Sequence, residues 1–383
     1  MESKKPALEQ HIAVLGESGS GKTVLLSSFY GATQEPQFVQ KSLFKVFADS
    51  TSQGNQLHQN YLGMRDSARL PEPNKFSASS YSFSLKLKDG SKGKPSKGKA
   101  HDVLRLVWHD YPGEWFEQDV SGPAEAQRKI DAFKALLGSD VALLLVDGQR
   151  LLDNAGEEER YLKSLFSNFR NGLLSLKDEL LDAGQPLVRF PRIWVLALSK
   201  ADLLPDLDVF NFRDLLIGKV AGEIDELRDV LAGFVDGADA LSVGEDFLLL
   251  SSAKFEPGNI EVKERVGLEL IIPMAAILPF ERHVRWAQMK HLPHKVAETL
   301  LSTAGVVATF INGFNLRGRG RLGKLLSFIG PDIQDAAIQA RDKVKEVNAE
   351  ALAQRDHMRA TLSRFRLDLD EAEDSQILLR SPR

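Results

Sequence analysis

The sequence predicts an α/β fold, a three-layer sandwich with a mainly parallel sheet, a helical insertion and an all-helical C-terminal region. From residue 11 to about 255, short apolar runs alternate with longer amphipathic stretches, as in a sheet wrapped by helices. After about residue 262 no segment has a strand pattern. We therefore expect one domain over residues 1–262, with an insertion at about 35–75, and a helical region over 263–383.

The strands of this fold are predicted from apolar runs. Buried strands are expected at 11–15, 103–108, 141–146, 193–198 and 247–250. Residues 76–87 alternate between apolar and polar side chains, which predicts a half-exposed edge strand paired with the strand at 103–108.

Helices are expected between the strands, at 22–29, 157–181 and 210–234, and in the insertion at 53–69. Residues 270–280 form an apolar run of 11 residues, far short of the roughly 20 that cross a bilayer, so we expect a buried helix. Over 332–372 apolar residues recur at spacings of three and four. This pattern favours a helix packed on its own chain over an intermolecular coiled coil.

The composition excludes several classes of function. The chain has 383 residues, 49 basic and 53 acidic side chains and no cysteine, so disulfides, thiolate nucleophiles and cysteine-ligated metals are excluded. Binding to nucleic acid needs a surplus of Lys and Arg, so no nucleic-acid partner is expected. The N-terminus lacks an apolar stretch of signal-peptide length, which predicts a cytoplasmic protein.

The strongest motif is GESGSGKT, which fits the phosphate-binding P-loop between a strand and a helix. Its glycines let the backbone N–H groups of residues 19–22 point at phosphates. Lys22 is expected to reach the β and γ oxygens, and the Thr23 hydroxyl to bind Mg²⁺. The nucleotide-binding residues expected here are Gly16, Glu17, Ser18, Gly19, Ser20, Gly21, Lys22, Thr23 and Val24.

A second motif, DYPG, ends the neighbouring strand. Asp110 stands where the second metal-directed carboxylate of a P-loop enzyme belongs, so Thr23 and Asp110 are the expected Mg²⁺ ligands. Gly113 supplies an N–H group for a γ-phosphate. Asp and Gly at this spacing usually form a simple turn, but the preceding strand favours the metal site.

Two further strand ends carry residues that suit guanine. Asp202, in SKAD, can accept hydrogen bonds from the N1–H and 2-amino groups of guanine, a donor pair that adenine lacks. The methylene stem of Lys200 is expected along the base. Ser252, Ala253 and Lys254 follow the strand at 247–250, where a backbone N–H can meet guanine O6.

The set GESGSGKT, DYPG, SKAD and SAK resembles the motif series of the translation-factor-class (TRAFAC) GTPases and spans about two thirds of the chain, from residue 16 to 254. The string DYPGEW over 110–115 resembles the YcjX-like stress-inducible GTPases in particular. The resemblance implies a P-loop NTPase fold and Mg²⁺-dependent binding of GTP and GDP. It also implies hydrolysis of GTP to GDP and phosphate, and a nucleotide-dependent switch.

Two positions depart from that motif series. Ser199 replaces the usual Asn or Thr of the guanine motif, and Glu114 stands where Ras-like GTPases place the glutamine that orients the attacking water. A carboxylate beside the γ-phosphate is repelled unless it is protonated or paired, so Glu114 acts as a base or turnover is slow without a partner. The expected catalytic residues are Glu114, Lys22 and Gly113.

The switch threonine and an arginine supplied in cis are not assigned by the motifs. Thr51 is the only threonine between Thr33 and Asp110. If the insertion resembles that of the Gα-like proteins, Arg69 or Arg65 is a candidate arginine, although a solvated arginine at a helix end is the simpler interpretation.

The C-terminal region is expected to contact a protein partner. Its basic segment RGRGRLGK, over 317–324, suits acidic lipid or an acidic protein surface, and an ordinary basic loop is the simpler interpretation. Two other functions stay open: a non-catalytic scaffold that GTP or GDP regulates, and an ATPase, against which Asp202 argues.

Overall fold

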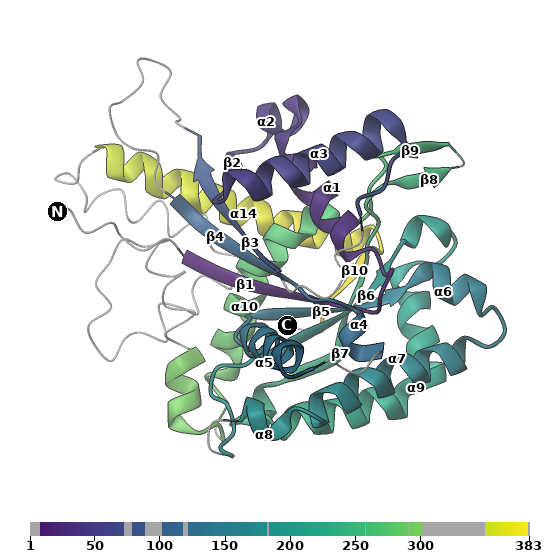
Figure 1. Cartoon of the computed structure of the whole chain (residues 1–383). Coiled ribbons are helices and arrows are strands. Elements are labelled where there is room, and N and C mark those ends of the chain that lie inside the picture. The colour runs from purple at the N-terminus through teal and green to yellow at the C-terminus, as the bar shows by residue number, and fades with distance from the viewer. Residues whose placement is uncertain are drawn as a thin grey trace.

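The computed structural model of the chain describes residues 8–72, 79–88, 102–117, 122–181, 184–256, 258–289, 291–300 and 349–381. A central sheet of eight strands runs through this part of the chain, in the order β10-β7-β6-β5-β1-β4-β3-β2. Figure 1 shows helices against both faces of the sheet. The predicted α/β sandwich is therefore confirmed.

Five neighbouring strands form the parallel part of the sheet. They are β7 (Ser242–Leu249), β6 (Ile193–Ser199), β5 (Val141–Asp147), β1 (Leu8–Leu15) and β4 (Asp102–Asp110). Every residue of β5 and β6 is buried, because helices cover both faces and each face needs apolar side chains. All five coincide with strands predicted from apolar runs.

Antiparallel strands extend the sheet on both sides. β3 (Ser79–Leu87) pairs with β4 as predicted, but it is not an edge strand, because β2 (Phe44–Ala48) pairs with its other side. On the opposite side β10 (Leu378–Leu379) pairs with β7, so the prediction of no strand after residue 262 is wrong. Two residues are too few for a strand pattern to show in the sequence.

The helices on the first face are α1 (Lys22–Gln34), α2 (Pro36–Lys41), α3 (Thr51–Ser67), α10 (Ile271–Trp286) and α14 (Ala349–Asp374). α3 is the helix predicted at 53–69. It packs closely on α1: a Cβ at Gly31 of α1 would lie only 2.1 Å from the ring of Tyr61 of α3, so this contact needs a glycine. α10 is buried as expected, and the buried Phe365 and Leu369 pack α14 on its own chain.

The second face carries α5 (Pro123–Leu137), α7 (Glu158–Leu174), α8 (Lys177–Leu180) and α9 (Val209–Ala232) over a separate apolar core. All but α5 were expected from the sequence. Shorter elements lie between the strands and helices: α4 (Glu114–Glu117), α6 (Gly148–Asp153), η1 (Ala201–Leu203), η2 (Ala238–Ala240), η3 (Leu268–Leu270), and a hairpin of β8 (Lys254–Glu256) and β9 (Asn259–Glu261).

The basic segment 317–324 and residues 332–348 of the expected long helix lie outside the described residues. Among the helices that are described, none is both long enough and apolar enough to cross a membrane.

Candidate functional site

The P-loop lies between β1 and α1. Gly19 and Gly21 have φ values of 81° and 89°, in the left-handed region that favours glycine, so the chain can turn sharply before α1 begins at Lys22. The ammonium group of Lys22 donates hydrogen bonds to the carbonyl oxygens of Gly16 at 2.7 Å and Glu17 at 2.8 Å. The loop therefore curls around the positive charge that the sequence assigns to phosphate binding.

The DYPG segment lies against the P-loop. A Cβ at Gly113 would lie 2.2 Å from the backbone nitrogen of Ser18 and 2.3 Å from the carbonyl carbon of Glu17, so this contact needs a glycine. The next residue, Glu114, accepts a 2.7 Å hydrogen bond at Oε1 from the hydroxyl of Ser18. Two of the expected catalytic residues are thus in direct contact with the phosphate-binding loop.

The aromatic residues of DYPGEW anchor this segment in the core. The ring of Tyr111 meets Trp115 and Phe133 edge to face, with centroids 5.1 Å and 4.6 Å apart. The indole of Trp115 donates a 3.1 Å hydrogen bond to Glu125 in α5. Burial raises the pKa of the Tyr111 hydroxyl well above its usual range, so the side chain stays neutral.

The expected Mg²⁺ ligands are a hydroxyl and a carboxylate, the hard oxygen donors that Mg²⁺ prefers. Thr23 is in the first turn of α1, and Asp110 ends β4 opposite Val14 of β1, two residues before the P-loop. No group of three or more Asp, Glu or His side chains in the described ranges is arranged to hold a metal. Mg²⁺ commonly keeps several waters and one or two protein ligands, so Thr23 and Asp110 suit it.

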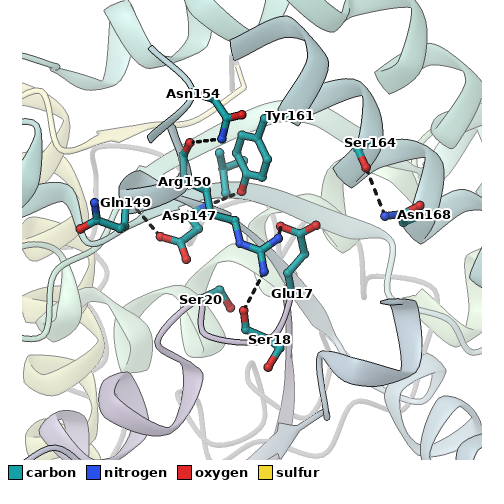
Figure 2. A network of polar contacts seen from close by, with 12 residues as sticks. Glu17, Ser18, Ser20, Asp147, Gln149, Arg150, Asn154, Tyr161, Ser164 and Asn168 are labelled. Atoms are coloured by element: carbon teal, nitrogen blue, oxygen red, sulfur yellow. Dashed lines mark hydrogen bonds and ion pairs between the residues drawn. The ribbon is translucent and has the colours of Figure 1, made fainter. Parts of the chain in front are cut away.

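A residue that the motifs did not indicate, Arg150 of α6, lies on the P-loop (Figure 2). Its Nη1 is 2.8 Å from Oε2 of Glu17, and its Nη2 donates a 3.1 Å hydrogen bond to the carbonyl oxygen of Ser18. The Glu17 side chain is only 6% exposed, and a buried carboxylate is stable when such a partner is present. The one signal in the sequence is the position of Arg150, three residues after β5 ends.

Lys200 lies between β5 and the P-loop. Its ammonium group donates a 2.8 Å hydrogen bond to Asp147, which ends β5 and also accepts from the backbone N–H of Gln149. A Cβ at Gly21 would lie 4.0 Å from Cε of Lys200, so the lysine stem passes beside the P-loop. Ser199, before it, is buried and donates a 3.3 Å hydrogen bond to the carbonyl oxygen of Val146.

The two expected guanine segments contact each other. Asp202 accepts hydrogen bonds from the Ser251 hydroxyl at 2.7 Å and from the backbone N–H of Phe255 at 3.3 Å. Ser252 and Ala253 are buried beside it. Lys254 instead lies on the exposed β8 hairpin, where its hydrogen bond to Glu256 raises the pKa of its ammonium group.

The candidate arginines of the insertion have exposed acidic partners. Arg65 lies 2.7 Å from Asp66, and Arg69, with 76% of its side chain exposed, lies 3.9 Å from Glu72. Thr51 is the first residue of α3 and is exposed. The contacts of Arg65 and Arg69 are therefore those of solvated arginines, the simpler interpretation of the sequence.

Comparison with known proteins adds a family to this geometry. A family model described as Double-GTPase 2 matches residues 10–217, which is more than half of the chain and includes the P-loop, DYPGEW and SKAD segments. No curated protein matches the chain significantly.

Several solved structures resemble the chain at low identity. Nucleolar GTP-binding protein 1 from Plasmodium falciparum is 14% identical over 81% of this chain and 99% of that chain, with a TM-score of 0.31. The cytosolic domain of the T. maritima FeoB iron transporter in GMPPNP form is 13% identical over 94% and 98%, with a TM-score of 0.28. Methanosarcina barkeri Roco2 RocCORdC bound to GDP is 14% identical over 85% and 68%, with a TM-score of 0.26. Because these TM-scores are low, the fold is identified from the sheet order and the P-loop described above and not from these structures.

Proposed function

Because the chain belongs to the Double-GTPase 2 family, we propose that it binds GTP and GDP with Mg²⁺ and hydrolyses GTP to GDP and phosphate. One observation carries the proposal: the four motif segments form a continuous set of contacts. Ser18 bonds to Glu114, Gly21 lies beside Lys200, and Asp202 bonds to Ser251. Segments separated by up to about 240 residues in sequence thus meet at the carboxyl ends of the parallel strands, where α/β proteins bind ligands.

Guanine is the base that these residues suit. The Asp202 carboxylate is held by Ser251 and the Phe255 backbone, which fixes its orientation for a donor pair on the base. The Lys200 stem offers an apolar surface between the base and the P-loop. Among the residues after β7, Ser252 and Ala253 remain the proposed base contacts. Lys254 is proposed to act only indirectly, because it lies on the β8 hairpin that follows them.

The phosphates are proposed to bind the backbone N–H groups of residues 19–22. Lys22 exchanges its bonds to the carbonyls of Gly16 and Glu17 for phosphate oxygens. Mg²⁺, held by Thr23 and Asp110, would supply charge neutralisation on the phosphates.

Turnover is proposed to be slow without a partner. The Glu114 carboxylate lies on the P-loop through Ser18, and its negative charge opposes an approaching γ-phosphate. At this position Glu114 could act as a base that activates water, or its charge could slow hydrolysis until a partner binds.

The proposed switch uses the C-terminal residues. The carbonyls of Gln376 and Ile377 accept hydrogen bonds from the backbone N–H groups of Val209 and Leu249, at 3.0 Å and 2.9 Å. Val209 begins α9, after the SKAD segment, and Leu249 ends β7, before the SAK segment, so the C-terminus contacts an element next to each proposed base-binding loop. We assign residues 1–262 to the nucleotide-binding domain and place the protein in the cytoplasm, with a protein partner bound to region 263–383.

Multiple-turnover phosphate release tests the proposal. With Mg²⁺ and GTP, the wild-type chain is expected to release more than one phosphate per molecule, whereas Lys22→Ala is expected to release none above background. Tight GTP binding without any turnover would favour the nucleotide-regulated scaffold instead. Equal turnover of ATP would favour the ATPase.

A further inference from the structure

We propose that Arg150 is a catalytic arginine of the GTPase reaction, supplied by the chain itself. Its guanidinium group would stabilise the charge that develops on the phosphoryl group during hydrolysis. The proposal rests on the proposed GTP hydrolysis and adds a residue that neither the motifs nor the family match assigns.

The topology places Arg150 at the phosphate end of the site. β5 lies next to β1 in the sheet, with Leu144 opposite Leu15, the last residue before the P-loop. Both strands run in the same direction, so α6, which follows β5, begins beside the P-loop that follows β1. Arg150 is thus brought to the loop by the main sheet and not by a surface loop.

The contacts of Arg150 hold its guanidinium group in one orientation. One end meets the buried Glu17 carboxylate at 2.8 Å and the other meets the Ser18 carbonyl at 3.1 Å. The Arg150 side chain is 36% exposed, so part of it stays accessible while the guanidinium group is bound to the loop. A planar guanidinium that binds two acceptors at once is far better oriented than the arginine of an ordinary surface ion pair.

Ser18 connects this arginine to Glu114, one of the expected catalytic residues. The Ser18 carbonyl accepts a hydrogen bond from Arg150, and the Ser18 hydroxyl donates one to Glu114. One P-loop residue is thus hydrogen bonded to both charged side chains. The next residue, Gly19, begins the N–H groups proposed to bind phosphates. Ser18 therefore holds the guanidinium group of Arg150 and the carboxylate of Glu114 next to the N–H groups proposed to bind phosphate.

The chemical step needs no atom from Arg150. A water oxygen bonds to the γ-phosphorus while the bond from that phosphorus to the β–γ bridging oxygen breaks. The electron pair of the broken bond stays on GDP, and the protons of the water end on inorganic phosphate and solvent. Arg150 acts through the charge and the planar N–H donors of its guanidinium group, which is the role of arginines that assist phosphoryl transfer.

The experiment compares full-length wild type, Arg150→Ala and Arg150→Lys, with Arg160→Ala as the matched control. Arg160 is an exposed arginine of α7 whose partner is Glu157. Three quantities are measured for each variant with Mg²⁺: the affinity for fluorescent GDP, the single-turnover rate of GTP hydrolysis, and the gain in GDP affinity on adding aluminium fluoride. Aluminium fluoride mimics the transferred phosphoryl group, so this gain reports binding of the transition state without turnover.

The proposal predicts that Arg150→Ala loses the gain from aluminium fluoride and that its hydrolysis rate falls by about 10² to 10⁴. Its GDP affinity should fall by a much smaller factor, because Glu17 loses its partner on the P-loop. Arg150→Lys is expected to recover little, because an ammonium group cannot bind two acceptors in the same plane. Arg160→Ala should match wild type in all three measurements.

Two results would overturn the role of Arg150. If Arg150→Ala weakens GDP and keeps both the hydrolysis rate and the aluminium fluoride gain, the arginine only supports the P-loop. If Arg150→Ala and Arg150→Lys both match wild type, the arginine has no part in the reaction. A wild-type chain that binds no guanine nucleotide instead contradicts the proposed function itself, so the two failures are distinguishable.

Discussion

The hydroxyl of Ser18 donates a 2.7 Å hydrogen bond to Oε1 of Glu114. This bond joins the P-loop to the residue after Gly113, across 96 positions of sequence. It holds a carboxylate that is only 7% exposed where a Ras-like GTPase would place a neutral glutamine. The charge of Glu114 should therefore discriminate between nucleotides with and without a γ-phosphate.

Glu114→Gln tests that discrimination. The amide oxygen of glutamine can still accept from Ser18, but the negative charge is removed, so a non-hydrolysable GTP analogue is expected to bind about tenfold more tightly. Affinity for GDP should change less than twofold, and Glu179→Gln, at an exposed residue of α8, should change neither. Titration of both nucleotides checks this, and an equal gain for GDP and the GTP analogue would argue against a γ-phosphate effect.

Gly113→Ala tests the close contact between DYPG and the P-loop. The added Cβ would lie 2.2 Å from the Ser18 nitrogen, so one of the two segments must move. We expect the affinity for GTP to fall by at least about tenfold. Gly218→Ala is the control, because nothing lies within 4 Å of a Cβ at Gly218 in α9. Unchanged GTP affinity in Gly113→Ala would mean that the contact does not support binding.

His109 should make the stability of the chain depend on pH. Burial, with a smaller contribution from the charge of nearby His11, lowers the pKa of His109 from 6.5 to about 4. Between these values the unfolded chain binds more protons than the folded chain, so the unfolding free energy falls as the pH is lowered from 6.5 to 4, by up to about 3 kcal/mol. The neutral imidazole is hydrogen bonded to Ser80 and His11.

Denaturant unfolding of wild type and His109→Gln between pH 7 and pH 4 measures this contribution. His109→Gln is expected to lose less stability than wild type over the same range, whereas His294→Gln, at an exposed histidine, should follow wild type. Parallel curves for wild type and His109→Gln would contradict the prediction.

Arg282 of α10 should be needed for stability rather than for nucleotide binding. Its Nη2 lies 2.5 Å from Oδ1 of Asp246, a fully buried carboxylate that also accepts a 2.9 Å hydrogen bond from the backbone of Ser381. Burial raises the pKa of Asp246, against the opposing effect of Arg282. Arg282→Met leaves that carboxylate buried without its cation, so the unfolding free energy should fall by about 3 to 5 kcal/mol.

The matched control for that change is Arg213→Met, which removes an exposed ion pair with Asp214 and should cost less than about 1 kcal/mol. Adding Asp246→Asn to Arg282→Met should restore part of the loss, because the unpaired charge is then removed. An equal loss of unfolding free energy in Arg282→Met and Arg213→Met would show that the buried pair contributes no more to stability than an exposed pair.

The sequence predicted those parts of the molecule that local pattern determines. Continuous apolar runs identified the five parallel strands, because a strand covered on both faces needs apolar residues throughout. The glycines and lysine of GESGSGKT identified the P-loop, and the expected TRAFAC-class GTPase is confirmed by the family match.

Features that depend on distant partners did not show in the sequence. β10 has two residues and exists because it pairs with β7, 130 positions earlier. Arg150 has no motif of its own, since its contacts with the P-loop follow from the pairing of β5 with β1 in the sheet. β2 was missed because a five-residue strand next to predicted helices gives little alternation to detect.

Equilibrium binding of fluorescent GTP, GDP and ATP analogues with Mg²⁺ tests the central claim most directly. Wild type is expected to prefer guanine nucleotides over ATP by roughly 10²-fold or more, and Asp202→Ala to lose that preference. Asp206→Ala, at an exposed aspartate nearby in the chain, should retain it. Equal binding of ATP by wild type, or an unchanged preference in Asp202→Ala, would contradict guanine recognition by Asp202.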